Sequence, residues 1–250
     1  MSRLIFVLLA ATLSAQEVPL FTKDFPPEEF AARRKAVYES IGTNGVAILQ
    51  GAPLPDGYIR FRQTNEFYYL CGVEAPHAYL LLSGQTKRAT LFLPHGNAMR
   101  ESWEGKSLHA DRADEVRKLT GVDAVQPLEA LAAALAAASY RAGDRPVLYT
   151  PMAPGEGLAV SRDIAIRTDT DAISDPFDGR APREGRFIQL IRERFPRYEL
   201  RDLTPLLDSM RVIKSPREIS LIERATRLAG QSMVEAMRST QPGQTEYELD

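Results

Sequence analysis

The chain contains 250 residues, of which 44% are apolar and 26% are charged. These values are typical of a globular protein with a hydrophobic core, and they exclude a disordered or collagen-like chain. Lysine and arginine total 31 against 33 aspartates and glutamates, so the net charge of -2 gives no excess of basic surface for nucleic acid. Cys71 is the only cysteine, which excludes an intramolecular disulfide and any zinc site with two or more thiolates.

The first residues have the pattern of a secretory signal peptide. Arg3 precedes the almost entirely apolar run 4–13, and small residues at 14–15 come before a polar pair. About ten apolar residues are too few for a membrane span, which needs about 20. We therefore predict that residues 1–15 are removed and that the mature chain is secreted or periplasmic, without a stable membrane anchor. The alternative is a buried N-terminal strand.

Short apolar runs then alternate with amphipathic segments. The prolines and glutamates at 26–29 predict the start of a helix that ends at Gly42. Short strands are predicted at 45–50, 79–82, 90–93 and 146–149, and an extended segment at 198–203. Further helices are predicted at 111–119, 128–140 and 187–195. This interleaving favours a layered, mixed α/β architecture over a β-sandwich or a helix bundle.

The pattern changes twice in the second half of the chain. Between 149 and 186, prolines and glycines interrupt the periodicity and predict mostly loop. Ser215, followed by proline and then by Glu218, forms a capping box that predicts a long helix up to about residue 240. A second capping box at 245–248 begins another helix just before the last residue. Because a helix needs more than one turn, we expect the natural protein to continue beyond Asp250.

The standard catalytic motifs are incomplete. Residues 105–107 resemble the end of a phosphate-binding loop, but the glycine required five positions earlier is Arg100. No nucleophile elbow and no His-Glu-x-x-His pair occurs. The histidines are too far apart in sequence for local metal binding, and we expect surface or core positions for them: His77, His95 and His109.

An acidic cluster and the cysteine also have simple structural explanations. The cluster has the oxygen ligands that a hard cation prefers, but it does not fit the calcium-loop pattern, so a solvated loop is favoured: Asp169, Asp171, Asp175 and Asp178. Cys71 lies in an apolar run and is expected to be a small buried hydrophobic residue. The residues alone therefore predict no complete catalytic site.

Two parts of the chain resemble a known enzyme family. The stretch 62–72, RQTNEFYYLCG, is followed by AYLLL, LFLP and SWEG at 78–82, 91–94 and 102–105, in the order found in the N-terminal domain of aminopeptidase P. The stretch 210–219, MRVIKSPREI, resembles the linker and first catalytic-domain helix of the same enzymes. The resemblance extends over about 25–250 and is specific to Xaa-Pro aminopeptidases, with the related prolidases and creatinases as the alternative.

The resemblance implies an α/β fold in two parts. Residues 16–208 would form a creatinase-type, ribonuclease-H-like N-terminal domain with a mixed sheet. Residues 209–250 would form the linker and first helix of a truncated pita-bread α+β catalytic domain. The implied enzyme is an exported metal-dependent Xaa-Pro aminopeptidase, a homo-oligomer that acts on peptides with proline in second position.

The resemblance also implies a metal centre outside this sequence. Members of the family use two divalent ions, usually manganese, to activate water and to stabilise the oxyanion. Their ligands lie beyond the first long helix, so no catalytic or metal-binding residue is assigned here, and the 250 residues alone are expected to be inactive.

Trp103 is the only substrate-binding candidate. Relatives have a tryptophan at this place that approaches the substrate pocket, sometimes across a subunit interface, and the alternative is a core or hinge aromatic. Glu66 and Cys71 depart mildly from the family pattern, which more often has aspartate and threonine there. The alternative to an enzyme is a non-catalytic binding or oligomerisation module of the same fold.

Overall fold

The computed structural model describes residues 24–55, 57, 61–155, 161–177 and 179–248. The predicted signal peptide, residues 1–15, therefore lies outside the described residues. Among those described, six strands form one sheet in the order β4-β3-β2-β1-β5-β6. The strands are β1 (Gly45–Gln50), β2 (Tyr79–Ser83), β3 (Arg88–Leu93), β4 (Ala124–Pro127), β5 (Val147–Thr150) and β6 (Glu199–Asp202).

The sheet is mixed, as expected for this fold class. Strand β2 pairs antiparallel with both β1 and β3, whereas β1–β5, β3–β4 and β5–β6 are parallel pairs. Strands β2 and β3 form a hairpin. The strands at 45–50, 79–82, 90–93 and 146–149 are confirmed to within a residue or two, and β4 was not predicted.

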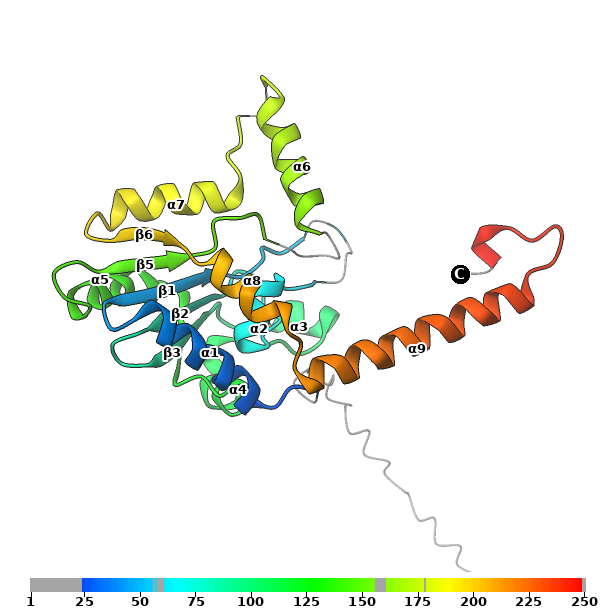
Figure 1. The fold of residues 1–250 in the computed structure, drawn as a ribbon, viewed down its shortest axis with the longest axis horizontal. Helices are drawn as coiled ribbons and strands as arrows, with labels where there is room; N and C mark the ends of the chain where they lie inside the picture. The colour runs from blue at the N-terminus through cyan, green and yellow to red at the C-terminus, as the bar shows by residue number, and fades with distance from the viewer. Residues whose placement is uncertain (1–23, 56, 58–60, 156–160, 178, 249–250) are drawn as a thin grey trace, which may run out of the picture.

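Helices cover both faces of the sheet (Figure 1). Their bounds are α1 (Pro27–Ile41), α2 (Asn65–Cys71), α3 (Ala98–Glu104), α4 (Ala113–Thr120), α5 (Leu131–Arg141), α6 (Arg162–Ser174), α7 (Arg183–Arg194), α8 (Thr204–Val212) and α9 (Pro216–Ser239). Short 3-10 turns at Ala110–Arg112 and Leu128–Ala130 lead into α4 and α5. These turns account for the earlier predicted starts of the two helices.

Alternating strand residues point to two separate cores. Ala47 and Leu49 pack with α1, α2, α4 and α8 on one face, while Val46 and Ile48 pack with α5 and α7 on the other. Successive side chains of a strand point to opposite faces, so a strand covered on both sides is apolar throughout. Cys71 is fully buried in the first core, which confirms the prediction of a small buried hydrophobic residue.

Helix α1 begins and ends as predicted. It has proline at the first helical position and two glutamates in the first turn, and its cap residue Gly42 has a φ of 69°. Arg34 is also buried on its inner face, and its guanidinium donates to the carbonyl oxygens of Leu70 at 2.9 Å and Gly121 at 2.6 Å. These bonds attach α1 to the ends of α2 and α4, because both acceptors are helix-terminal carbonyls.

The prediction of mostly loop between 149 and 186 was wrong. Helix α6 occupies Arg162–Ser174, and α7 already begins at Arg183. None of the α6 residues is buried, and its isoleucines, at 164, 166 and 173, do not recur at spacings of three and four, so no regular apolar stripe reveals the helix. Figure 1 shows α6 projecting away from the sheet beside α7. The prolines and glycines that suggested a loop all lie outside 158–175.

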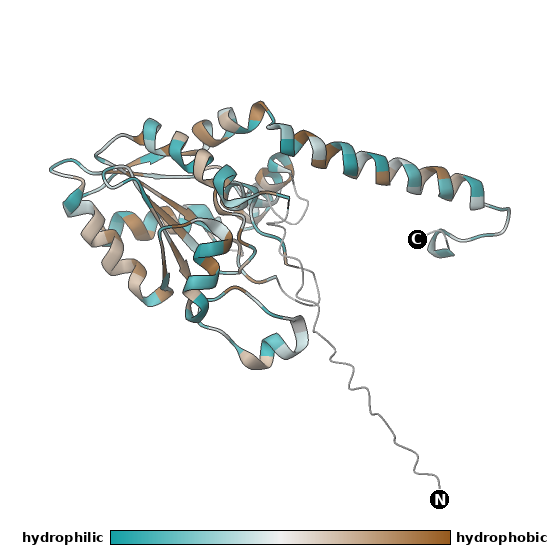
Figure 2. Ribbon diagram, turned by 90° about the horizontal axis from the view of Figure 1, so that it is seen from below, coloured by the Kyte–Doolittle hydropathy of each residue, from teal (hydrophilic) through white to brown (hydrophobic). Residues whose placement is uncertain are grey.

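Helix α9 confirms the predicted capping box. Ser215 Oγ accepts from the Glu218 amide at 3.2 Å, and the Glu218 carboxylate accepts from the Ser215 amide at 2.7 Å. The helix extends away from the sheet, and apolar residues alternate with polar ones along it (Figure 2). Its apolar residues Ile222 and Met233 are 52% and 68% exposed. In the described part of the chain, no helix is both long and apolar enough to cross a membrane.

Candidate functional site

Trp103 lies in an exposed segment between β3 and α4. Its side chain is 86% exposed and that of Met99, one turn earlier on α3, is 77% exposed. Asn97 caps the helix by accepting from the Arg100 amide at 3.0 Å, and Gly105 ends it with a φ of 90°. Trp103 is therefore placed on the surface and not in either core.

The two ends of this segment meet at one carboxylate. Asp111 Oδ1 lies 2.6 Å from His95 Nδ1, and Asp111 Oδ2 accepts from the Gly96 amide at 2.8 Å. His109 Nδ1 lies 3.2 Å from Asp111 Oδ2. His109 Nε2 is 3.7 Å from Glu101 Oε1, on α3 itself. This cluster could not be predicted from the sequence, because its members are brought together only when the segment between β3 and α4 folds back on itself.

The hydrogen bonds of this cluster shift the pKa values of three of its members. The hydrogen bond to Asp111 raises the pKa of His95 above its ordinary value. The Gly96 amide, and next the His95 ring, lower the pKa of Asp111. Hydrogen bonds from Ser107 lower the pKa of Glu101. His95 and His77 are surface residues, as predicted, whereas the His109 side chain is only 12% exposed.

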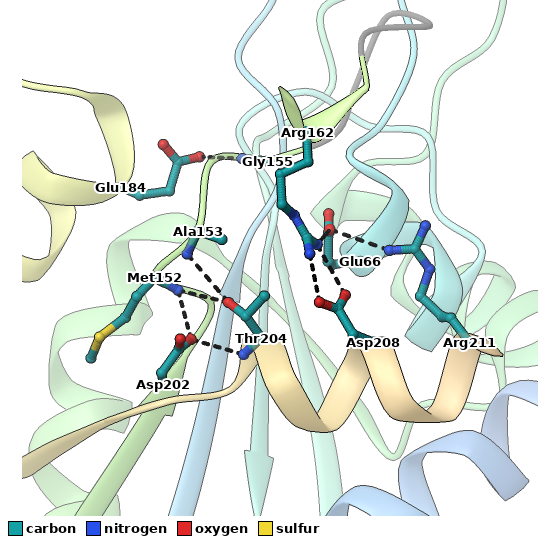
Figure 3. A network of polar contacts seen from close by, with 10 residues as sticks. All are labelled: Glu66, Met152, Ala153, Gly155, Arg162, Glu184, Asp202, Thr204, Asp208 and Arg211. Atoms are coloured by element: carbon teal, nitrogen blue, oxygen red, sulfur yellow. Dashed lines mark hydrogen bonds and ion pairs between the residues drawn. The ribbon is translucent and has the colours of Figure 1, made fainter. Parts of the chain in front are cut away.

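A second polar network connects three helices near the carboxyl ends of β5 and β6 (Figure 3). Glu66, on α2, is its buried centre and has a side chain only 6% exposed. Its Oε1 lies 3.1 Å from the guanidinium of Arg162, on α6, and 3.4 Å from that of Arg211, on α8. Arg162 also donates to both carboxylate oxygens of Asp208, at 2.5 and 3.0 Å. This network fixes the start of α6 against α2 and α8.

Further hydrogen bonds in the same region hold the chain that follows β5. The Met152 amide donates to Asp202 Oδ1 at 3.0 Å and to Thr204 Oγ1 at 3.1 Å. Beyond it, the Gly155 amide donates to Glu184 Oε1 at 3.2 Å (Figure 3). A cavity of about 330 Å³ opens beside these contacts. Its lining is mostly apolar and includes Pro53, Pro55 and Pro154, but it also carries side chains of both charges: Arg62, Asp169, Arg183 and Glu184.

The described residues supply no metal centre. Among them, no group of three or more histidine, cysteine, aspartate or glutamate side chains is placed to hold a metal ion. In the acidic cluster, Asp169 and Asp171 lie on α6 and Asp175 follows its last turn, so these residues belong to a solvated helix and its end instead of the expected loop. Asp178 lies outside the described residues. The expected manganese ions are assigned to no residue here.

The sequence and the fold both match aminopeptidases P. Residues 30–148 match the family model described as "Aminopeptidase P, N-terminal domain". The chain is 28% identical to the Xaa-Pro aminopeptidase of Haemophilus influenzae over 232 residues, which cover 90% of this chain and 46% of the relative.

Solved structures give the same result. Aminopeptidase P of Escherichia coli with the inhibitor Pro-Leu superposes with a TM-score of 0.61 at 26% identity, covering 89% of this chain and 47% of that one. A zinc-substituted form of the E. coli enzyme in complex with product also superposes with a TM-score of 0.61, at 24% identity, over the same shares of the two chains. The chain thus spans about half the length of these relatives.

Proposed function

We propose that the chain forms the leading part of an Xaa-Pro aminopeptidase. The reason is that residues 30–148 belong to the aminopeptidase P N-terminal domain family. The observation that carries the proposal is the extent of the match. The alignment with the Haemophilus influenzae enzyme covers 90% of the chain, so the similarity continues well beyond residues 30–148. The proposed reaction is hydrolysis of the peptide bond between an N-terminal residue and a following proline.

The proposed enzyme depends on two divalent metal ions, with manganese as the expected metal. Such a pair generates a hydroxide nucleophile at neutral pH and stabilises the charge that develops on the carbonyl oxygen. The zinc-substituted state of the E. coli relative supports a divalent metal in that enzyme. In our proposal the metal ligands follow residue 250, and the 250 residues alone are inactive.

Three further properties belong to the proposal. Residues 1–15 direct export, and the mature enzyme is secreted or periplasmic. Trp103 contacts the peptide substrate, either in its own subunit or across the interface of a homo-oligomer. The high exposure of Trp103 supports this contact role, because an indole ring offers a large apolar surface with one hydrogen-bond donor.

The test uses the complete open reading frame. The gene is read past Asp250, the full protein is purified, and release of the first residue is measured from a pair of peptides that differ only in proline or alanine at position two. We expect manganese-dependent cleavage of the proline peptide, loss of activity with a chelator and recovery when manganese is restored. The 250-residue chain assayed in parallel should release nothing.

A reading frame that stops at residue 250, together with an inactive protein, would reject the peptidase. The chain would then be a non-catalytic binding or oligomerisation module. A full-length enzyme that cleaves both peptides equally would retain a metallopeptidase but reject its specificity for proline.

A further inference from the structure

The exposed segment that carries Trp103, residues 96–108, is held at its ends and not along its length. None of the described α3 side chains is buried. At the far end, Leu108 enters the first core, and the Ala110 amide donates to the Pro94 carbonyl at 3.0 Å. Because apolar burial is the main force that fixes a surface element, the position of α3 depends on the polar contacts at these ends.

Asp111 connects to both ends of the segment. One of its oxygens faces His95 and the other accepts from the Gly96 amide, so a single side chain fixes the departure of the segment from β3. The same carboxylate lies 3.2 Å from His109, which follows the end of the segment. Among the described residues His109 Nδ1 makes no hydrogen bond, so this is a close contact only, whereas the hydrogen bond between His95 and Asp111 is charge-assisted and therefore stronger than a neutral one.

The His109 ring fills the space between the two ends. A Cβ atom at Gly96 would come within 2.8 Å of the ring, so any other residue at this position would displace it. On its other side the ring faces Glu101, whose Oε1 also accepts from the Ser107 amide at 3.1 Å and from the Ser107 hydroxyl at 3.0 Å. Glu101 therefore connects α3 to the chain that follows it, and Asp111 connects the two ends of the segment to each other.

We propose that Asp111 is a positioning residue that holds the Trp103 segment through His95 and His109, and that the hold is strongest when Asp111 is ionised and His95 is protonated. The connection of this hold with catalysis rests on the proposed role of Trp103. The test therefore observes the segment itself and needs no peptidase activity.

The direction of the pH effect follows from the groups that face the two histidines. Asp111 and Glu129 face His95, and Asp111 and Glu101 face His109, with Arg112 as the nearby cation. The pKa of His95 is raised above 6.5, so its contribution is complete below that value and is lost as the pH rises through the raised pKa. The pKa of Asp111 is lowered below 3.8, so its contribution is lost only in stronger acid. A neutral His95 still donates one hydrogen bond, so the segment loosens above neutrality without detaching.

Trp103 provides the measurement, because it is the only tryptophan in the chain. Time-resolved anisotropy of its fluorescence reports the local motion of α3 independently of the emission intensity. In the wild type, we expect the amplitude of the fast component to be smallest at about pH 5–6 and to increase as His95 loses its proton. In His95→Gln this pH dependence should be largely absent.

Asp111→Asn is the decisive variant, and Asp114→Asn is its matched control. Asp114 is three residues further along, its side chain is 89% exposed, and the same single charge is removed. In Asp111→Asn we expect a larger fast component at every pH from 5 to 8 and trypsin cleavage after Lys106 that is roughly two- to five-fold faster. The control should match the wild type. Wild-type anisotropy in Asp111→Asn, or an unchanged pH profile in His95→Gln, would overturn the proposal, whatever the peptidase assay gives.

Discussion

Replacing Glu66 with alanine should destabilise the fold more than the loss of any single exposed ion pair would. The carboxylate is 6% exposed and lies between Arg162 and Arg211, at 3.1 and 3.4 Å. Its removal would leave two guanidinium groups close together without the negative charge between them. Removing one partner of a buried ion pair typically costs about 3–5 kcal/mol, because the remaining charge stays desolvated.

The structure places Glu66→Ala at the lower end of this range. The two arginine side chains are 22% and 26% exposed, so water screens part of their repulsion. Arg162 also keeps its paired contacts with Asp208. We expect a loss of about 3 kcal/mol in the free energy of unfolding. For a protein of this size, that corresponds to a fall of about 6–12 °C in the melting temperature.

Urea unfolding followed by far-ultraviolet circular dichroism measures this loss. Glu115→Ala is the matched control, because Glu115 also pairs with an arginine but its side chain is 40% exposed. The control should cost less than about 1 kcal/mol. If Glu66→Ala were no more costly than Glu115→Ala, the network in Figure 3 would contribute nothing through burial, and the reasoning would be wrong.

Three further outcomes are expected. Burial raises the pKa of Cys71 to about 12, so a thiol reagent at pH 8 should label this residue only when the protein unfolds. The fold should also lose stability above about pH 9, where the thiol ionises in the unfolded chain but not in the folded one. Labelling of the native chain at the rate of a free thiol would contradict this. Ser215→Ala should cost about 1 kcal/mol and speed amide exchange in the first turn of α9, whereas Ser232→Ala in the middle of the helix should leave that turn unchanged. Mass spectrometry of the exported protein should find a chain that starts near Gln16, and an intact Met1 would reject the signal peptide.

The strands could be predicted because their cause is local. Each strand is short and lies between turn residues, and β1 and β2 are apolar over most of their length because helices cover both faces. Helix α1 is equally local, since its prolines, glutamates and terminal glycine lie within one segment. For these elements the sequence neighbours of a residue already determine its conformation.

Helix α6 could not be predicted in this way because no apolar stripe identifies it. Its attachment depends on Arg162, which contacts Glu66 from a position 96 residues away. The Asp111 cluster presents the same difficulty on a smaller scale, because 16 residues separate His95 from its carboxylate partner. A polar contact between distant residues leaves no periodic pattern, and only the folded chain shows which charges meet.

The capping box of α9 has both a local signal, which the sequence shows, and contacts with distant residues, which it does not. Ser215 and Glu218 are readable as a helix start, but the sequence does not reveal that the same residues contact α1. Ser215 Oγ donates to Glu29 at 2.6 Å, and Glu218 lies 3.3 Å from Arg33. Arg33 is held in turn by stacking against Tyr69 at 4.2 Å.

These contacts make the N-terminal cap of α9 its attachment to the sheet domain. Since none of the residues of α9 is buried, its direction cannot be set by packing along its length. It must be set at the first turn, with the pair of Arg224 and Asp24, at 3.1 Å, as the further contact two turns along. In an enzyme whose catalytic domain begins with this helix, α1 would therefore determine how that domain is oriented against the sheet.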